Sequence, residues 1–304
     1  MPFATDSYRI ASVTVALDPD RERLLAQLRA LEGQADDRIV VDNGSRQGLD
    51  AMLRSAGVDA HILRLERNQG VAAGFNLGVE AAIGRGATHV LLLDHDSIPA
   101  PNMLAVLRGV MADKESLQQN VAAVGPCTSD GRDARELPFI RLGWLRNHHV
   151  RPRGTSDVVS CDFLITSGAL VPVRAYRELG AFDESFFVDN VDLEWCFRAR
   201  SRGFLLYGAA GARLDHRLGD RRVRIGNRQL VVHSPERLYY MTRNRLLLYQ
   251  RPYAPLKWKL KDALRGAAKF AATMMFVAPR AEYARMTWRG LSDALQRRAG
   301  RLRG

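Results

Sequence analysis

Two aspartates, Asp94 and Asp96, follow an apolar run and are separated by a single histidine. Residues 89–93 have the length and composition of a buried strand, and ligands of α/β sheets bind just outside the carboxyl ends of such strands. Carboxylates at that position suit Mg²⁺ or Mn²⁺, which proteins commonly share with the phosphates of a substrate. The spacing therefore predicts a metal-bridged diphosphate. The alternative from these residues alone is a solvated turn that ends a strand.

The segments around these aspartates alternate between strand and helix. Hydrophobic periodicity predicts strands over residues 10–17, 38–41, 60–65 and 89–94, and helices over residues 20–31, 49–56 and 71–83. This βαβαβαβ series predicts an α/β fold with a Rossmann-like, mostly parallel sheet flanked by helices. Asp42, the RNQG turn at residues 67–70 and the Asp94/Asp96 pair all follow strands, so we expect them at one edge of the sheet.

The glycines of the third helix argue against a dinucleotide-binding domain. Gly70, Gly74 and Gly78 are spaced by four, and the first strand is followed by LDPD at residues 17–20 instead of a G-x-G-x-x-G turn. Glycines four residues apart share one helix face, so Gly74 and Gly78 are expected to let the helix pack closely on the sheet. Gly70, in the turn, would let the backbone approach a ligand.

Composition limits the class of protein. With 304 residues, of which 46% are hydrophobic, the chain can bury one large α/β core or two modest domains. Its three cysteines are widely spaced and form no C-x-x-C pair, which is typical of a reducing cytoplasm. Residues 1–7 have no signal-peptide pattern, and no apolar stretch reaches the roughly 18–20 residues of a transmembrane helix.

The positive charge is concentrated at the end of the chain. Residues 251–304 contain 13 Lys or Arg and three acids, a net charge of +10 out of +12 for the whole chain. Such asymmetry predicts a polyanionic partner. Residues 263–278 are apolar but interrupted by Arg265 and Lys269, which is typical of a helix lying on an anionic membrane surface. The alternative is a basic helix packed on the catalytic domain.

Several motifs occur together in a recognisable order. They are VVDNGS at residues 40–45, NQGVAAGFNLG at 68–78, LLDHDS at 92–97, SGALV at 167–171, GAFDESFFVDNVDLEWCFR at 180–198 and LDHRLG at 214–219. With these motifs the chain, from about residue 10 to about residue 251, resembles the inverting family 2 glycosyltransferases of GT-A fold, and most of all the bacterial dTDP-rhamnosyltransferases. The resemblance implies metal-dependent transfer of a 6-deoxyhexose, L-rhamnose from dTDP-L-rhamnose, to a hydroxyl of a surface polysaccharide, glycan or lipid-linked glycan acceptor.

The resemblance also implies roles for individual residues. Asp42 would hydrogen-bond the pyrimidine base, and Arg67, Asn68 and Gly70 would lie along the nucleotide. Asp94 and Asp96 match the D-x-D motif of the family, in which Asp94 would lie beside the nucleotide and Asp96 would bind Mg²⁺ or Mn²⁺. His216 would be a further metal ligand; the alternative from the residue alone is a satisfied surface histidine.

Inversion by direct displacement requires a base for the acceptor hydroxyl. Family members usually carry it in a Glu-Asp pair followed by Val-Asp, whereas this chain has Asp189-Asn190 followed by Val191-Asp192. We expect Asp189 to be the base and Asp192 to be the second candidate. Acids at the start of a helix can also serve only as partners of the helix dipole, and for Asp192 this alternative stays open.

Other features leave alternatives for the substrate and the class. The chain has ALDP at residues 16–19 where the family commonly has Thr-Tyr-Asn-Pro, so another donor such as a UDP-hexose stays open. A phosphatase of the haloacid dehalogenase type also uses Asp-x-Asp, but after its first strand and not its fourth. Nucleic-acid binding by the basic tail is the non-enzymatic alternative. No nucleic-acid partner is expected, because no known binding motif is present.

The organisation that follows is one catalytic domain and an extension. Residues 1–250 would form the GT-A domain, with a nucleotide-sugar half at about 1–125 and an acceptor half at about 126–250. Residues 251–304 would form a basic helical C-terminal extension. Acceptor contacts are expected from residues 137–159 and 239–244. The protein is expected in the cytoplasm, peripheral on the inner face of the cell membrane.

Overall fold

The computed structural model describes residues 8–130, 135–152, 154–216, 221–225 and 228–302. Its main sheet has the strand order β10-β12-β6-β11-β4-β1-β2-β3, with β5 paired to β12 and β7 paired to β6. The strands of this sheet are β1 (Ile10–Ala16), β2 (Asp37–Asp42), β3 (His61–Arg64), β4 (His89–Asp94), β5 (Ser97–Pro99), β6 (Val121–Asp130), β7 (Arg135–Glu136), β10 (Val158–Cys161), β11 (Leu170–Pro172) and β12 (Leu205–His216). Two hairpins lie outside it, β8 (Phe139–Arg141) with β9 (His148–Val150), and β13 (Arg221–Ile225) with β14 (Arg228–Val232).

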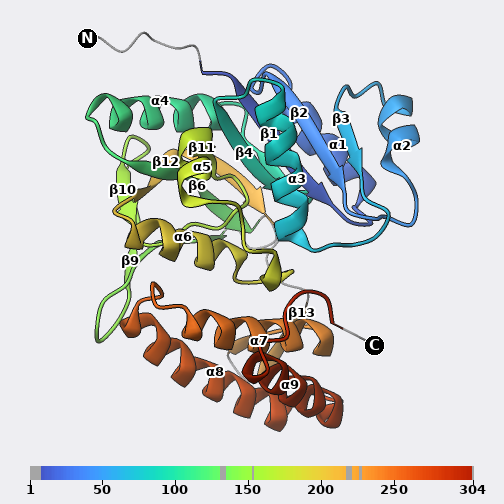
Figure 1. Ribbon diagram of the computed structural model, residues 1–304, viewed down its shortest axis with the longest axis vertical. Helices are drawn as coiled ribbons and strands as arrows, with labels where there is room; N and C mark the ends of the chain where they lie inside the picture. The colour runs from blue at the N-terminus through green and yellow to red at the C-terminus, as the bar shows by residue number, and fades with distance from the viewer. Residues whose placement is uncertain (1–7, 131–134, 153, 217–220, 226–227, 303–304) are drawn as a thin grey trace.

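The helices of the described chain surround this sheet (Figure 1). They are α1 (Arg21–Ala30), α2 (Leu49–Ser55), α3 (Val71–Gly84), α4 (Met103–Ser116), α5 (Val173–Leu179), the short 3₁₀ helix η1 (Glu184–Phe186), α6 (Val191–Ser201), α7 (Pro235–Gln250), α8 (Leu256–Phe276) and α9 (Arg280–Leu295). The seven elements expected over residues 10–94 are all present, and their ends differ from the expected ends by one residue at most. The α/β fold with a mostly parallel sheet is therefore confirmed in this half.

Alternation of side chains along each strand produces the layers. In β1, Val13 and Val15 face α3, where they pack against Phe75 and Val79. The next residues along the strands face the other way: Leu91 and Leu93 of β4 pack with α4, and Ala16 and Val40 pack with α1 and α2. Because side chains alternate between the two faces of a strand, both faces of the sheet are buried under helices.

The sheet becomes mixed in the second half of the chain. Strand β11 runs antiparallel to both of its neighbours, β4 and β6, while β12 returns parallel to β6. Strand β12 is long enough to pair with β6 along one edge and then, at Leu214 to His216, with β5 along the other. This geometry brings His216 beside the turn that follows β4, although the two are far apart in sequence.

The last three helices form a layer of their own below the sheet in Figure 1. Helix α7 packs against α9, and Tyr239 of α7 donates a hydrogen bond to Asp293 of α9 at 2.8 Å. Helix α7 thus belongs by its residue numbers to the catalytic domain expected over residues 1–250, but it packs against the C-terminal extension expected over residues 251–304. Among the described residues, no helix is both long and apolar enough to cross a membrane.

The close packing expected at the glycines of α3 is confirmed. A Cβ at Gly78 would lie 2.3 Å from Val13 Cγ1, and one at Gly74 would lie 2.7 Å from Val15 Cγ1. A Cβ at Gly84, at the end of the same helix, would meet nothing within 4 Å.

We therefore expect opposite effects from the same substitution on one helix. Gly78→Ala should lower the free energy of unfolding by about 1–3 kcal/mol, because the added methyl overpacks a buried contact. Gly84→Ala should be neutral or raise it by about 0.4–1 kcal/mol, because alanine restricts the unfolded chain. Urea unfolding curves of both variants measure this. Equal midpoints for the two variants would contradict the packing argument.

Candidate active site

A cavity of about 820 Å³ opens at the carboxyl ends of β1, β2 and β4. This is the edge at which sheets of this type bind ligands, and the volume is that of a small-molecule site. Of the residues predicted to form the site, seven line this cavity: Asn68, Gly70, Asp94, Asp96, Asp189, Asp192 and His216. Asp42 and Arg67 are not among its lining residues. The structure thus brings together residues from four separate motifs.

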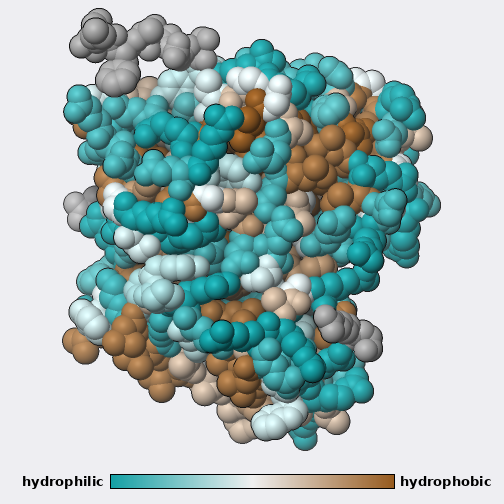
Figure 2. Space-filling model, viewed as in Figure 1, coloured by the Kyte–Doolittle hydropathy of each residue, from teal (hydrophilic) through white to brown (hydrophobic). Residues whose placement is uncertain are grey.

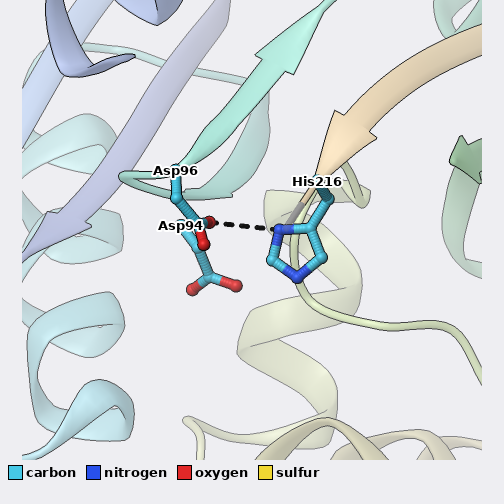
Figure 3. Close-up of side chains that lie close together, drawn as sticks. All are labelled: Asp94, Asp96 and His216. Carbon is cyan, nitrogen blue, oxygen red and sulfur yellow. Dashed lines mark ion pairs between the residues drawn. The ribbon is translucent and has the colours of Figure 1, made fainter. Parts of the chain in front are cut away.

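Asp94, Asp96 and His216 form a cluster in which one ligand atom of each residue lies within 4.8 Å of the others. Figure 3 shows the carboxylates on the turn after β4 and the imidazole reaching them from the end of β12. The His216 Nδ1 atom lies 3.2 Å from Asp96 Oδ1 and 2.7 Å from the Ser97 hydroxyl. Two carboxylates and an imidazole are a donor set that suits a divalent cation such as Mn²⁺.

The protonation of this cluster follows from its crowding. Burial, together with the adjacent Asp96 charge, raises the pKa of the Asp94 carboxyl, although His216 acts in the opposite direction. Burial also opposes the charged forms of Asp96 and His216, but their hydrogen bond and the charges around them together outweigh it. That bond lowers the pKa of Asp96 and raises the pKa of His216. The cluster is therefore a place where positive charge is stabilised.

Two side chains of α1 hold the turn that carries these carboxylates. Gln27, fully buried, donates its amide hydrogens to the carbonyls of Asp94 and Ser97, both at 2.6 Å, and accepts a hydrogen bond from Thr14. Arg23 donates to the Asp96 carbonyl at 2.7 and 3.0 Å. The sequence showed these residues only as part of an amphipathic helix, and no spacing signal relates them to a turn about 70 residues away.

A second network shapes the end of the cavity that Asn68 and Gly70 line. The Asn43 side chain donates to Asn68 Oδ1 at 3.2 Å and to the Gly70 carbonyl at 3.1 Å, and it accepts from the Gln69 N–H. Gly70 has a φ of +94°, and a Cβ there would lie 2.5 Å from the Phe187 carbonyl oxygen. Only glycine combines that backbone conformation with so close an approach. Asn43 is thus a lining residue that the site prediction omitted.

Asp42 and Arg67 occupy different environments. Asp42 is fully buried, and its Oδ1 accepts the Ser45 N–H at 2.9 Å. Its Oδ2 atom is buried without a hydrogen-bond partner, and the nearest cation, Arg64 Nε, is 3.9 Å away. Buried carboxylate oxygens normally have a partner, so this orphan acceptor requires an explanation. Arg67 is exposed.

The acidic side of the cavity is built on an unusual backbone. Phe187, Asp189 and Asn190 all have positive φ, between 60° and 64°. Helix α7 holds this 186–190 loop: the buried Asn244 amide donates to the carbonyls of Phe186, Val188 and Asp189. The buried Arg243 guanidinium donates to the Phe186 carbonyl at 3.2 Å. Strained backbone of this kind persists only where its surroundings impose it, and it concentrates at functional sites.

The two candidate bases differ in their partners. Asp189 is paired with Arg237, whose Nη2 lies 3.1 Å from Oδ1 and whose Nε lies 3.3 Å from Oδ2. Asp192, in the first turn of α6, accepts the Leu193 N–H at 2.8 Å. Burial, and then the charges of Asp189 and Asp94, raise the pKa of Asp192 to about 6. No motif or spacing in the sequence indicated that Arg237 belongs to the site.

The cavity as a whole can bind an anionic ligand through a cation and present a carboxylate to a second substrate. Its metal-type cluster and its 186–190 loop face the same space. A carboxylate near such a loop can accept a proton from a hydroxyl, and a cation can neutralise a departing diphosphate.

Comparisons with known proteins agree with this architecture. The family model described as glycosyl transferase family 2 matches residues 21–173, half of the chain. The chain is 29% identical over 258 residues to the dTDP-rhamnosyl transferase RfbF of Shigella flexneri, and the match covers 84% of each protein. It is 33% identical over 175 residues to the galactofuranosyltransferase GlfT1 of Mycolicibacterium smegmatis, covering 57% of this chain and 54% of that protein.

Solved structures share the fold at low identity. A GalNAc-T7 structure with UDP, GalNAc and Mn²⁺ has a TM-score of 0.58 at 14% identity, over 91% of this chain and 59% of that one. The S. aureus TarS 1–349 structure in complex with UDP-GlcNAc has a TM-score of 0.53 at 14% identity, over 95% and 81%. With the family match, the fold and the cavity in agreement, the chain belongs to glycosyl transferase family 2, and it is a glycosyltransferase of GT-A fold.

Proposed function

We propose that this glycosyltransferase moves L-rhamnose from dTDP-L-rhamnose to a hydroxyl of a surface polysaccharide or lipid-linked glycan, with inversion at the anomeric carbon. The observation that carries the donor assignment is the similarity to a dTDP-rhamnosyl transferase, which extends over 84% of both chains. A UDP-hexose is the alternative donor, because the residues 16–19 that follow β1 differ from the family's common pattern.

The residues of the cluster fit a divalent cation, Mg²⁺ or Mn²⁺. Asp96 and His216 are the proposed protein ligands, with Asp94 beside them, because their oxygen and nitrogen atoms lie within 4.8 Å of one another. A cation bound there would neutralise charge on the diphosphate as it leaves. The Gln27 and Arg23 contacts to the backbone of the turn keep Asp94 and Asp96 pointed at this position.

For the nucleotide, we assign the pyrimidine base to Asp42 and the ribose and phosphates to the side of Arg67, Asn68 and Gly70. The buried, unpartnered Oδ2 atom of Asp42 supports this assignment, because a base N–H would supply the missing donor. Asp42 is fully buried, so the base reaches it only after the packing around it opens.

For the acceptor, we assign the general base to Asp189, with Asp192 as the second candidate. The acceptor hydroxyl oxygen forms a bond to the anomeric carbon while the bond from that carbon to the diphosphate breaks. The electron pair leaves with dTDP, and the hydroxyl proton passes to the carboxylate. Asp192, with its pKa raised to about 6, would be a base suited to a neutral pH.

The donor and the cation can be tested together. Wild-type protein should hydrolyse dTDP-L-rhamnose slowly in the presence of Mn²⁺, and faster than it hydrolyses UDP-hexoses at equal concentration. Asp96→Ala should lose Mn²⁺-dependent dTDP binding and transfer, because it loses a ligand. Isothermal titration and a product assay measure both effects. The exposed Asp113→Ala variant is the control. Undiminished Mn²⁺-dependent dTDP binding in Asp96→Ala would contradict the proposed cation site. Faster hydrolysis of UDP-hexoses would show that the donor is a UDP-hexose and not dTDP-L-rhamnose.

The base is tested by turnover. Asp189→Asn should lower turnover by roughly 10²- to 10⁴-fold, because the amide cannot accept the proton, while affinity for dTDP does not fall. Near-normal turnover in the folded variant would move the role to Asp192. In that case the rate should fall as the pH drops through about 6, where the Asp192 carboxylate becomes protonated.

Access to a lipid-linked acceptor is proposed to come from α8. Its Leu256, Leu260 and Leu264 are 59%, 56% and 74% exposed and recur every four residues, so they form one apolar stripe. Figure 2 shows apolar side chains at the lower end of the molecule, where α8 lies in Figure 1. The lysines of α8 face inward instead: Lys257 donates to the Leu142 carbonyl, and Lys261 to Asn147. The helix therefore packs through the buried Trp258 and these lysines, and it exposes the leucine stripe.

We propose that this stripe enters the interface of an anionic membrane. An exposed apolar stripe of this kind marks an interaction surface. The charge of this helical layer favours a lipid surface, because each exposed arginine contributes about 1 kcal/mol near anionic headgroups. The exposed arginines of the layer are Arg265, Arg280, Arg285, Arg297, Arg298 and Arg301. Both expectations for the basic tail, packing on the protein and lying on a membrane, are compatible in this arrangement.

The membrane surface is tested by point variants, since deletion of residues 253–304 would also remove α9, the helix that packs on α7. Wild-type protein should sediment with vesicles that contain phosphatidylglycerol and detach as salt rises. Leu260→Glu/Leu264→Glu should stay in solution, while Leu117→Glu, at an exposed site on the opposite domain, should sediment. Equal sedimentation of wild type and the double variant would contradict the proposal. A dimer that the wild type forms and the double variant does not form would also contradict the proposal, because the stripe would then join two copies of the chain.

A further inference from the structure

Arg237 stands out by its charge. Of the side chains that line the described part of the cavity, it is the only Arg or Lys. The lining carboxylates are five: Asp94, Asp96, Asp189, Asp192 and Glu236. A nucleoside diphosphate sugar adds two more negative charges, and its leaving group carries a further one. A guanidinium forms paired hydrogen bonds with phosphate oxygens as readily as with a carboxylate, so Arg237 is equipped for either partner.

In the structure, Arg237 is engaged with the proposed base. Its Nη2 and Nε atoms lie 3.1 and 3.3 Å from the two carboxylate oxygens of Asp189, one donor to each oxygen. A carboxylate that accepts hydrogen bonds on both oxygens from a cation is poorly placed to take a proton from a hydroxyl, because the cation stabilises its charged form. In this arrangement the base is occupied.

Of the two partners, Arg237 has the longer and more exposed side chain. The backbone of Asp189 is fixed, because the buried Asn244 amide holds its carbonyl and those of Phe186 and Val188. Arg237 lies in the first turn of α7 on a long side chain that is 36% exposed, whereas the Asp189 side chain is 16% exposed. Arg237 and Asp94 of the metal-type cluster line the same cavity.

We propose that Arg237 exchanges partners during the reaction: it pairs with Asp189 in the empty site and turns to the donor diphosphate when the donor binds. It is then a catalytic residue that stabilises the leaving diphosphate, and its departure frees the Asp189 carboxylate for the acceptor hydroxyl. Donor binding would thereby activate the base, so the acceptor is deprotonated only when a donor is in place. The second part of this inference depends on the proposed role of Asp189.

The experiment compares a nucleoside diphosphate with its nucleoside. Affinities of dTDP and thymidine are measured by titration calorimetry with Mn²⁺ present, in wild type, Arg237→Met, Asp189→Asn and the double variant. Arg237→Met should weaken dTDP by roughly 10- to 100-fold and leave thymidine unchanged, because a charge-assisted phosphate contact is lost. Arg237→Lys, which keeps the charge but not the paired geometry, should lie between.

The exchange itself predicts a coupling between the two residues. Asp189→Asn should tighten dTDP binding about fivefold when Arg237 is present, because the competing ion pair is gone. In the Arg237→Met background the same substitution should change dTDP affinity less than twofold. Arg245→Met is the control, since it breaks the ion pair of the same helix with Asp262, outside the cavity lining, and should leave dTDP affinity unchanged.

Two results would overturn the inference. One is equal weakening of dTDP and thymidine in Arg237→Met, or no weakening of either, because no phosphate contact would then exist. The other is an equal effect of Asp189→Asn in both backgrounds, because no partner exchange would then occur. Failure of the proposed function is recognised separately. If wild type binds UDP and not dTDP, the same series is run with UDP and uridine. If turnover survives Asp189→Asn, the base is another residue, but the test of the contact between Arg237 and the phosphates is unchanged.

Discussion

Four carboxylates on the wall of one cavity, Asp94, Asp96, Asp189 and Asp192, impose a constraint that much of this structure serves. Like charges that are close together and partly withdrawn from water raise each other's pKa, and the cost falls only if cations or hydrogen-bond donors face them. The protein answers in three ways. His216 faces Asp94 and Asp96, Arg237 pairs with Asp189, and Asp192 holds its proton up to a pH of about 6. A bound cation or a substrate could take the place of each of these partners of the carboxylates.

The carboxylates are useful only if they cannot move apart, and the backbone around them is held from a distance. Gln27 in α1 fixes the turn after β4, and Asn244 in α7 fixes the 186–190 loop, each through one buried amide that donates to two or more carbonyls. Buried carbonyls left without donors are costly, so these amides make each conformation the lowest in energy. Both anchors act on main chain, which explains how they position side chains that they do not touch.

The sequence was sufficient for features with a local pattern. Short apolar runs and helical periodicity predicted the elements of residues 10–94, because these patterns reflect burial directly. The pair Asp94 and Asp96 was predicted from its spacing after a strand, but His216 was added only through the resemblance, since it lies more than 100 residues further along the chain. Arg237 and Gln27 were missed, and Asn244 was expected only in an acceptor segment and not as an anchor of the 186–190 loop, because contacts between distant segments leave no periodic trace. The orientation of α8 was also hidden: its composition shows lysines and leucines, but only the packing shows which side faces out.

The helical layer is therefore part of the site and not an appendage to it. Arg237, Arg243 and Asn244 all belong to α7, which packs against α9, and Arg243 also donates to the carbonyl of Gly300 near the end of the chain. The same layer presents the apolar stripe of α8 to solvent. Because α7 packs with the other helices and also holds the 186–190 loop, a displacement of the layer would be transmitted to the backbone of Asp189. A catalytic domain that ended at residue 250 would keep the residues of the cavity but lose the packing that keeps α7, and with it Asp189, in place.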